Sequence, residues 1–163
     1  APAADNEGQS SQDKGKPWVW VIELDEASCA DLWQAWEAHE AQAPANFQRV
    51  ADLHVTLLYI GGGSDVEVAS RHPDLGGPEE VAGFRENLEN RQGMEVVVEA
   101  TCIVWDDRVA AVEVQGLGNL SANQAPHVTL AHAPRVPART SNELLARKAA
   151  GANLEQGLER YQQ

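Results

Sequence analysis

The sequence predicts an α+β protein with a mostly antiparallel sheet, on the basis of two observations. Predicted strands and helices follow one another in the order strand, helix, strand, helix, hairpin, strand. This order is roughly repeated, because each half of the chain ends in a strand that carries the tetrapeptide His-Val-Thr-Leu. The 163 residues suffice for one domain or for two small lobes with a shared core. We therefore expect two related lobes that face each other.

The first half of the chain is expected to hold two strands, a helix and a loop. The predicted elements are a strand at 18–24, a helix at 29–40 with Ser28 as its N-cap, a strand at 53–60 and a surface loop at 64–77. The strands are rich in β-branched and aromatic residues. The helix repeats apolar residues at Leu32, Trp33 and Trp36, which should lie on the sheet. Turn-forming residues in the last segment are typical of a loop.

The second half is expected to hold a helix, a hairpin, a strand and a short helix. The predicted elements are a helix at 78–90, hairpin strands at 94–105 and 108–114, a strand at 126–131, a helix at 142–151 and a helical or frayed tail at 152–163. Pro78 suits the first turn of a helix. Asp106 and Asp107 favour the hairpin turn, and Ser141 is the expected cap of the last helix.

The composition excludes several classes of protein. Hydrophobic residues make up 43% and charged residues 23%, as in an ordinary globular protein. No apolar run approaches the roughly 20 residues that span a bilayer, and the N-terminus lacks the apolar core of a signal peptide. We expect 1–16 to be a flexible linker and 17–163 to be the folded domain. We also expect an intracellular monomer that forms part of a larger multidomain chain.

The net charge of −13 limits how the protein can bind nucleic acid. Proteins that track along nucleic acid carry a basic stripe, because neutralising phosphates supplies most of their affinity. That stripe is absent from this sequence. If the substrate is RNA, the protein should therefore hold only its last one or two nucleotides.

The chemistry is expected at the repeated tetrapeptide, at His54–Leu57 and His127–Leu130. Side chains alternate across a strand, so the His and the Thr of each copy share one face while the Val and the Leu share the other. Each copy then has an apolar pair toward the core and a polar pair facing away from it. Two such strands side by side would present His54, His127, Thr56 and Thr129 to one ligand.

This set of side chains suits phosphodiester hydrolysis. Opening a cyclic phosphate needs a base for the attacking water and an acid for the departing sugar oxygen. Histidine, with an ordinary pKa of about 6.5, serves in either role at neutral pH. The hydroxyls of Thr56 and Thr129 can donate to the phosphate oxygens where charge accumulates. This chemistry requires neither a metal nor another cofactor.

The paired His-x-Thr motifs resemble those of the 2H phosphoesterase superfamily. The second motif and its sequel, PHVTLAHAPRVPARTSNELL, are similar to the cyclic phosphodiesterase domain of plant and fungal tRNA ligases. The resemblance implies two mostly antiparallel sheets with flanking helices, related by a pseudo-two-fold axis around a central cleft. It implies hydrolysis of an RNA-terminal 2',3'-cyclic phosphate to a 2'-phosphate and a 3'-hydroxyl, in tRNA splicing or RNA end repair. By the same analogy, His54 would be the acid and His127 the base.

Three further residues are candidates for substrate binding. Trp105, at the hairpin tip, could stack on a base, although packing in the core is at least as good an interpretation. Arg135 and Arg139 follow the second motif and could bring positive charge to the phosphate, or could simply be solvated. We expect the partner to be an RNA 3' end or a cyclic nucleotide, with no metal and no membrane.

The two motifs are also compatible with other functions. The motifs address a phosphate and not a base or sugar, so another cyclic nucleotide or a 2'-5' linkage would serve as well. A non-catalytic nucleotide-binding module is a different class, which tight binding without turnover would favour. A purely structural domain is the weakest alternative, because packing does not require identical polar faces on two distant strands.

Overall fold

The computed structural model describes residues 19–61 and 63–151, together with the backbone of 155–156 and 161–162. The linker predicted at 1–16 lies outside the described residues. The chain forms two compact units. Of the described residues, unit 1 draws on 19–22, 56–61, 63–96 and 117–124, and unit 2 draws on 23–55, 97–116 and 125–151 with the short strands at 155–156 and 161–162.

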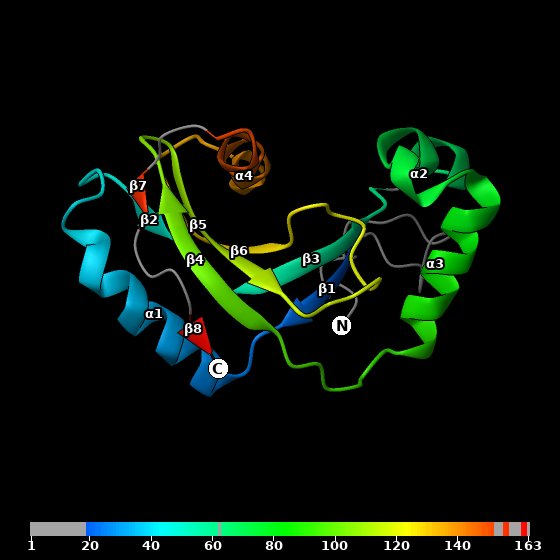
Figure 1. Ribbon diagram of the computed structural model, residues 1–163, viewed down its shortest axis with the longest axis horizontal. Coiled ribbons are helices and arrows are strands. Elements are labelled where there is room, and N and C mark those ends of the chain that lie inside the picture. The colour runs from blue at the N-terminus through cyan, green and yellow to red at the C-terminus, as the bar shows by residue number, and fades with distance from the viewer. Residues whose placement is uncertain (1–18, 62, 152–154, 157–160, 163) are drawn as a thin grey trace. The chain divides into compact units, whose positions relative to one another are not determined.

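Unit 2 is built around an antiparallel sheet, with the strand order β3-β6-β5-β4-β7 (Figure 1). Its strands are β2 (Gln48–Arg49), β3 (His54–Tyr59, which begins in unit 2 and continues into unit 1), β4 (Glu99–Trp105), β5 (Val109–Gln115), β6 (His127–His132), β7 (Glu155–Gln156) and β8 (Tyr161–Gln162). Beyond the main order, β2 pairs with β6 and β8 pairs with β4. The predicted hairpin is confirmed as the antiparallel pair of β4 and β5.

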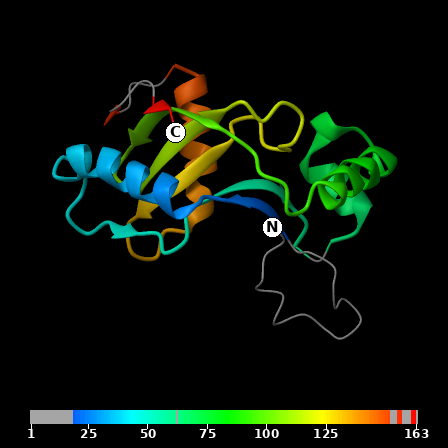
Figure 2. The same cartoon turned by 90° about the horizontal axis from the view of Figure 1, so that it is seen from below.

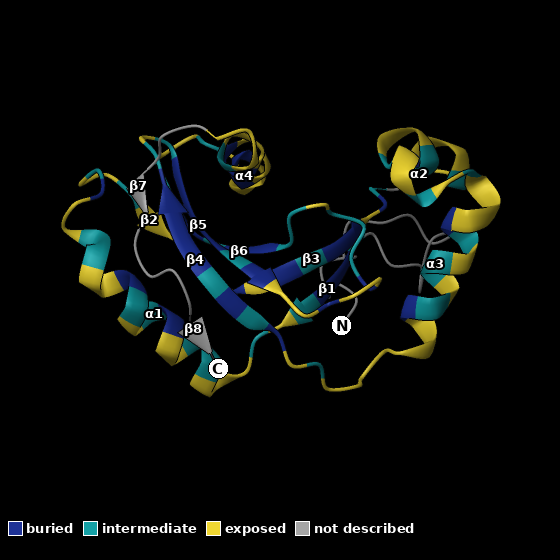
Figure 3. Ribbon diagram, in the orientation of Figure 1, coloured by how far each residue is buried: buried dark blue, intermediate teal, exposed yellow. Residues whose placement is uncertain are grey.

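Two helices cover opposite faces of this sheet, α1 (Glu26–Glu40) and α4 (Ser141–Ala149) (Figures 1 and 2). From α1, the Trp36 ring packs edge-on against Trp105 of β4, with ring centroids 5.6 Å apart. From α4, Leu144 and Leu145 join a buried cluster with strand residues that include Val104. Successive strand residues point to opposite faces, so β4 supplies neighbouring side chains to both helices. Figure 3 shows the resulting burial of β4, β5 and β6.

Unit 1 combines β1 (Val19–Glu23), which pairs with β3, with a set of helices. These are α2 (Asp65–Arg71), the short 3-10 helix η3 (Pro73–Leu75) and α3 (Pro78–Asn90). The side chains of Arg85 in α3 and Asp65 in α2 form an ion pair of 2.8 Å, which joins the two helices. The predicted strand at 18–24 and helix at 78–90 are confirmed within the described residues.

The predicted loop at 64–77 is wrong, because it holds α2 and η3. Ser64 caps α2 by accepting a hydrogen bond of 3.3 Å from the backbone N–H of Glu67. Val68, one turn further along, is fully buried. A cap and one buried apolar residue are thus enough to form a short helix here, although its proline and turn-forming neighbours favour a loop.

Other boundaries also differ from the prediction. Helix α1 starts at Glu26, because the side chain of Asp25 caps it by accepting a 2.7 Å hydrogen bond from the N–H of Ser28. The expected helical or frayed tail is wrong at 155–156 and 161–162, which pair with β4. Residues 94–98, expected to start a hairpin strand, precede β4 without forming a strand.

The α+β class with antiparallel pairing is confirmed, but the expectation of two sheets is wrong. The described strands belong to one hydrogen-bonded sheet, because β3 pairs with β1 in unit 1 and with β6 in unit 2. The two-lobed arrangement with a central cleft and pseudo-two-fold symmetry stays a prediction. In the described part of the chain, no helix combines the length and the apolarity that crossing a membrane requires.

Candidate active site

The two repeated motifs begin on neighbouring strands of unit 2. Val55 of β3 pairs with Val128 of β6 in antiparallel register. Residues opposite one another in such a ladder share a face. One step along each strand, His54 is therefore opposite Thr129. The His of one motif thus lies beside the Thr of the other, on the face opposite the buried valines.

Both histidines are held by the backbone in the same way. Nδ1 of His54 lies 3.0 Å from the carbonyl oxygen of Asp52, and Nδ1 of His127 lies 2.8 Å from that of Ala125. A carbonyl oxygen only accepts hydrogen bonds, so Nδ1 carries the proton in each ring. Nε2 is then the nitrogen that can gain or lose a proton during a reaction.

The two imidazoles differ in exposure and in the partner of Nε2. His54 is exposed, and in the described residues its Nε2 has no hydrogen-bond partner. His127 is only 8% exposed, and its Nε2 lies 3.0 Å from the Oγ of Ser141. His54 is therefore open to water, whereas His127 is enclosed by protein.

Ser141, at the start of α4, connects the two polar residues of the second motif. Its side chain is fully buried, and its Oγ lies 2.8 Å from Oγ1 of Thr129 and 2.7 Å from the carbonyl oxygen of Ala138. The prediction that Ser141 caps the helix is wrong, because its hydroxyl is directed to β6 and to Ala138. The N-cap residue is Thr140, whose side chain makes no capping hydrogen bond.

The surroundings of His127 act on its charge in opposite directions. Burial lowers the pKa of His127 below its usual value, since the charged ring loses its hydration. The Ala125 carbonyl opposes this shift, the charge of His54 lowers the pKa further, and the Glu113 carboxylate raises it. Glu113 lies opposite His127 in the ladder and forms an ion pair of 3.1 Å with Lys148 of α4. The net result is a lowered pKa.

A model of the fungal tRNA ligase phosphodiesterase domain matches residues 28–162. The chain belongs to this family. The match covers most of the sequence and both motifs, and it confirms the resemblance drawn from them. The protein is therefore an enzyme of the cyclic phosphodiesterase kind found in tRNA ligases. No curated protein and no solved structure gave a significant match.

Thr56 of the phosphodiesterase domain lies in the part of β3 that belongs to unit 1. Its side chain is half-buried, and its carbonyl oxygen accepts a 3.2 Å hydrogen bond from the side-chain amide of Asn123. The alternation of the strand directs Thr56 to the same side of β3 as His54. Its contact with a phosphate shared with His127 stays a prediction.

Trp105 does not contribute an exposed ring to the phosphodiesterase domain, so its interpretation as a stacking residue is wrong. It is only 2% exposed and packs between α1 residues, with the ring of Trp36 at 5.6 Å and that of His39 at 5.4 Å. The tip of the hairpin is formed instead by Asp106, whose Oδ1 accepts hydrogen bonds from the N–H groups of Arg108 and Val109.

Arg135 and Arg139 are both exposed and follow β6. Arg135 occupies a left-handed backbone conformation with φ of 67°. Arg139 belongs to the 3-10 helix η4 (Ala138–Thr140), and its neighbour Ala138 binds Ser141. Within the described residues, neither guanidinium forms a hydrogen bond or ion pair, so both remain available to an anion. The same part of the chain holds no group of three or more His, Cys, Asp and Glu side chains suited to a metal ion.

Proposed function

We propose that this domain hydrolyses a 2',3'-cyclic phosphate at an RNA end to a 2'-phosphate and a 3'-hydroxyl, without a metal ion, in tRNA splicing or RNA end repair. The observation that carries the proposal is the pair of imidazoles fixed through Nδ1 by the same backbone contact. This contact leaves Nε2 of each ring for proton transfer. Membership of the tRNA ligase phosphodiesterase family supports the choice of substrate.

The reaction needs two proton transfers and no redox step. One imidazole takes a proton from a water molecule as the water oxygen bonds to phosphorus. The bond from phosphorus to the 3' oxygen breaks, and the other imidazole donates its proton to that oxygen. Each transfer typically accelerates such a reaction by about 10²–10⁴-fold. One ring gains a proton and the other loses one, so the total number of protons on the enzyme is unchanged. Exchange with solvent then returns each ring to its starting state.

Hydrogen-bond donors near the histidines would stabilise the phosphate as charge accumulates. We assign this role to the hydroxyls of Thr56 and Thr129, and Thr129 lies opposite His54 in the β3–β6 register. The Thr129 hydroxyl contacts Ser141 at 2.8 Å, so it would have to turn from Ser141 to donate to the phosphate. Arg139, beside Ala138 in η4, would add positive charge, and Arg135 would do so at a greater distance along the chain. Because the whole chain carries a charge of −13, these few groups would have to bind the substrate locally.

Incubation with a 2',3'-cyclic nucleotide in the presence of EDTA tests the proposal. We expect full activity with the chelator, and phosphorus NMR should identify the 2'-phosphate as the product. Activity that disappears with EDTA and returns with a divalent metal would contradict the metal-free mechanism.

A substrate panel separates the remaining alternatives. Faster turnover of a 2'-5' linkage or of another cyclic nucleotide would keep the two-histidine chemistry and change the substrate. Tight nucleotide binding without any turnover would overturn the enzymatic proposal in favour of a binding module.

A further inference from the structure

Glu113 is the acidic residue of β5, and it lies beside His127. The two residues are opposite each other in the antiparallel pair of β5 and β6, so their side chains share one face of the sheet. Helix α4 covers this face, because Ala111, on the same side of β5 as Glu113, packs in one buried cluster with Leu144 of α4. A carboxylate therefore lies next to the imidazole on the face that α4 covers.

Lys148, in the last turn of α4, pairs with this carboxylate. Its Nζ lies 3.1 Å from Oε1 of Glu113, and the two side chains are only 26% and 29% exposed. Salt screens a partly buried pair much less than an exposed one. At the start of the same helix, the hydroxyl of Ser141 contacts Nε2 of His127 at 3.0 Å. Helix α4 thus contacts His127 through its first residue and holds the neighbouring carboxylate through its last turn.

The charge of Glu113 acts on His127 against the effect of burial. Burial has the largest effect on the pKa of His127 and lowers it, because the charged ring loses its hydration. The carboxylate of Glu113 raises the pKa, because a negative charge favours the charged ring. Pairing with Lys148 offsets part of this negative charge. The protonation of His127 therefore depends on whether Glu113 is paired.

Few other charged side chains lie on the elements packed around His127. Beyond Glu113 and Lys148 they are His54 on β3, Arg139 on η4, and Glu143 and Arg147 on α4. The charge of His54 lowers the pKa of His127. The two residues of α4 form ion pairs with residues of the hairpin turn between β4 and β5. In the described part of the chain, Glu113 is therefore the carboxylate that favours the charged form of the ring.

We propose that Glu113 and Lys148 are positioning residues of this site: Glu113 supplies a negative charge next to His127, and Lys148, by pairing with Glu113, sets how much of that charge acts on the ring. Both residues act through His127 and need no contact with the substrate. The effect on catalysis rests on the proposed hydrolysis. The charge relationship is the same whichever of the two histidines serves as the acid.

Histidine titration by NMR, in the full chain without substrate, tests this relationship. The signal of His127 is assigned by its loss in His127→Gln. Glu113→Gln should lower the pKa of His127 by about half a unit, because the negative charge is lost. Lys148→Met should raise it by about as much, because the carboxylate is no longer neutralised. A pKa that does not change, or that moves the other way in either variant, would overturn the proposal.

The double variant shows whether Lys148 acts through Glu113. In the Glu113→Gln background there is no carboxylate to neutralise, so adding Lys148→Met should raise the pKa of His127 much less than it does alone. An equal rise in both backgrounds would mean that Lys148 acts on the ring directly, and would overturn the proposed coupling. Titration of His54 in the same spectra shows that each variant is folded.

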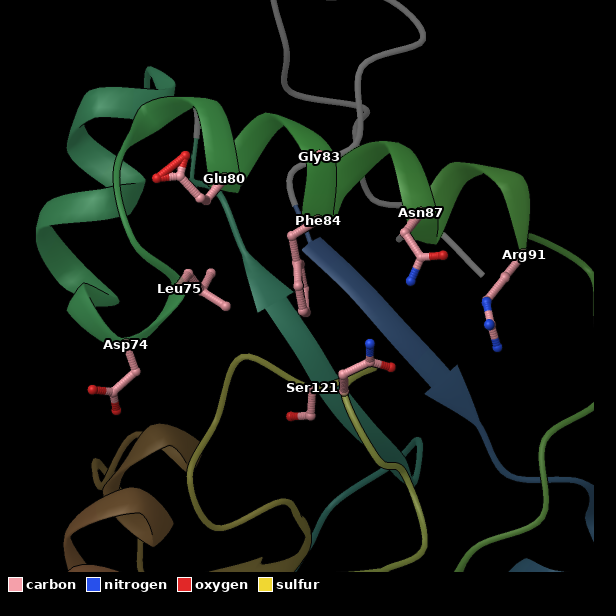
Figure 4. A pocket seen from close by; sticks show the side chains of 9 residues that line it. Asp74, Leu75, Glu80, Gly83, Phe84, Asn87, Arg91 and Ser121 are labelled. Atoms are coloured by element: carbon pink, nitrogen blue, oxygen red, sulfur yellow. The ribbon is translucent and has the colours of Figure 1, made fainter.

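Two matched controls separate this pair from a change in net charge. Arg147→Met removes the same charge from the neighbouring position of α4, where Arg147 pairs with Asp106. Glu80→Gln removes one negative charge in unit 1, where Glu80 borders a pocket of about 410 Å³ that Phe84 also lines (Figure 4). Both controls should leave the pKa of His127 unchanged. If a control shifts it as far as its counterpart does, net charge explains the effect and the proposal fails.

The pH profile of hydrolysis gives the functional measurement. The limb of the kcat profile that reports His127 should move to lower pH in Glu113→Gln and to higher pH in Lys148→Met. Lys148→Arg keeps the positive charge and should restore the wild-type profile. A pair that only anchors α4 would alter stability and leave the limb in place, and this result would overturn the proposal. If the wild-type protein hydrolyses no cyclic phosphate, the proposed function fails, while the NMR titration still decides the role of Glu113 and Lys148.

Discussion

Val55 and Val128 form an antiparallel pair between β3 and β6, and both side chains are completely buried. This single register relationship sets His54 opposite Thr129 on the other face of the sheet. A shift of one residue would move every side chain of a strand to the other face. Burial of the two valines therefore also keeps the first histidine on the side of the sheet where Thr129, Ser141 and His127 form their hydrogen-bonded set.

Removing either histidine should remove nearly all activity. In His54→Ala or His127→Ala, we expect kcat for a 2',3'-cyclic nucleotide to fall by about 10²–10⁴-fold, because one proton transfer loses its catalyst. Steady-state kinetics measures the loss. His72→Gln, in unit 1, should keep wild-type kcat and serves as the control. A His54 variant with near-normal kcat would exclude two-histidine catalysis.

The hydroxyl of Thr129 should matter more than its methyl group. We expect Thr129→Ala to lower kcat by roughly 10²-fold, since a donor to the developing charge is lost. Thr129→Ser keeps the hydroxyl and should retain most of the activity. Comparable losses in the two variants would mean that Thr129 contributes through packing, and circular dichroism would then show whether the fold has changed.

Stability should fall as the pH decreases below about 6.5, the ordinary pKa of histidine. Burial lowers the pKa of His127 in the folded state, so the unfolded chain binds more protons in this range and is favoured by acid. Urea unfolding at about pH 7.5 and about pH 5.5 measures the difference in free energy. His127→Gln, which cannot gain this proton, should show a smaller decrease. An equal decrease in both proteins would assign the effect to other groups.

Trp105 should contribute to stability and not to substrate binding. Truncation in Trp105→Ala removes the ring that packs against Trp36, and we expect the free energy of unfolding to fall by about 3–5 kcal/mol. Trp105→Phe keeps an apolar ring and should leave KM for the cyclic nucleotide unchanged. A large rise in KM for the Phe variant, with normal stability, would restore the stacking interpretation.

The two arginines after β6 form a matched pair for testing local charge. We expect Arg139→Ala to raise KM by about tenfold at low salt and by less at high salt, because screening already weakens an exposed charge. Arg135→Ala removes the same charge four residues earlier in the chain and should change KM less. Equal effects of the two variants would indicate a general contribution of positive charge rather than a contact from η4.

The local parts of the fold could be predicted where one short-range signal was strong. Pro78 and the apolar spacing of the following turns gave α3 its observed bounds. The alternation in the HVTL strands gave the correct exposed and buried faces at His54, Val55 and Val128. The prediction of a loop at 64–77 was wrong, because Pro73, Gly76 and Gly77 favour a loop and follow directly after a short capped helix. Where the local sequence favours a helix only weakly, tertiary burial determines whether the helix forms. In α2 the buried residue is Val68.

The sequence by itself determined the chemistry of the site, because two copies of His-Val-Thr-Leu specify two imidazoles and two hydroxyls on polar strand faces. Only the tertiary structure decided which groups surround each ring. It enclosed His127 beneath the start of α4, gave its Nε2 a serine partner and left His54 exposed. It also moved Trp105 from an expected hairpin tip into the core. Identical tetrapeptides thus acquire different surroundings, because burial and hydrogen-bond partners come from segments distant in the chain.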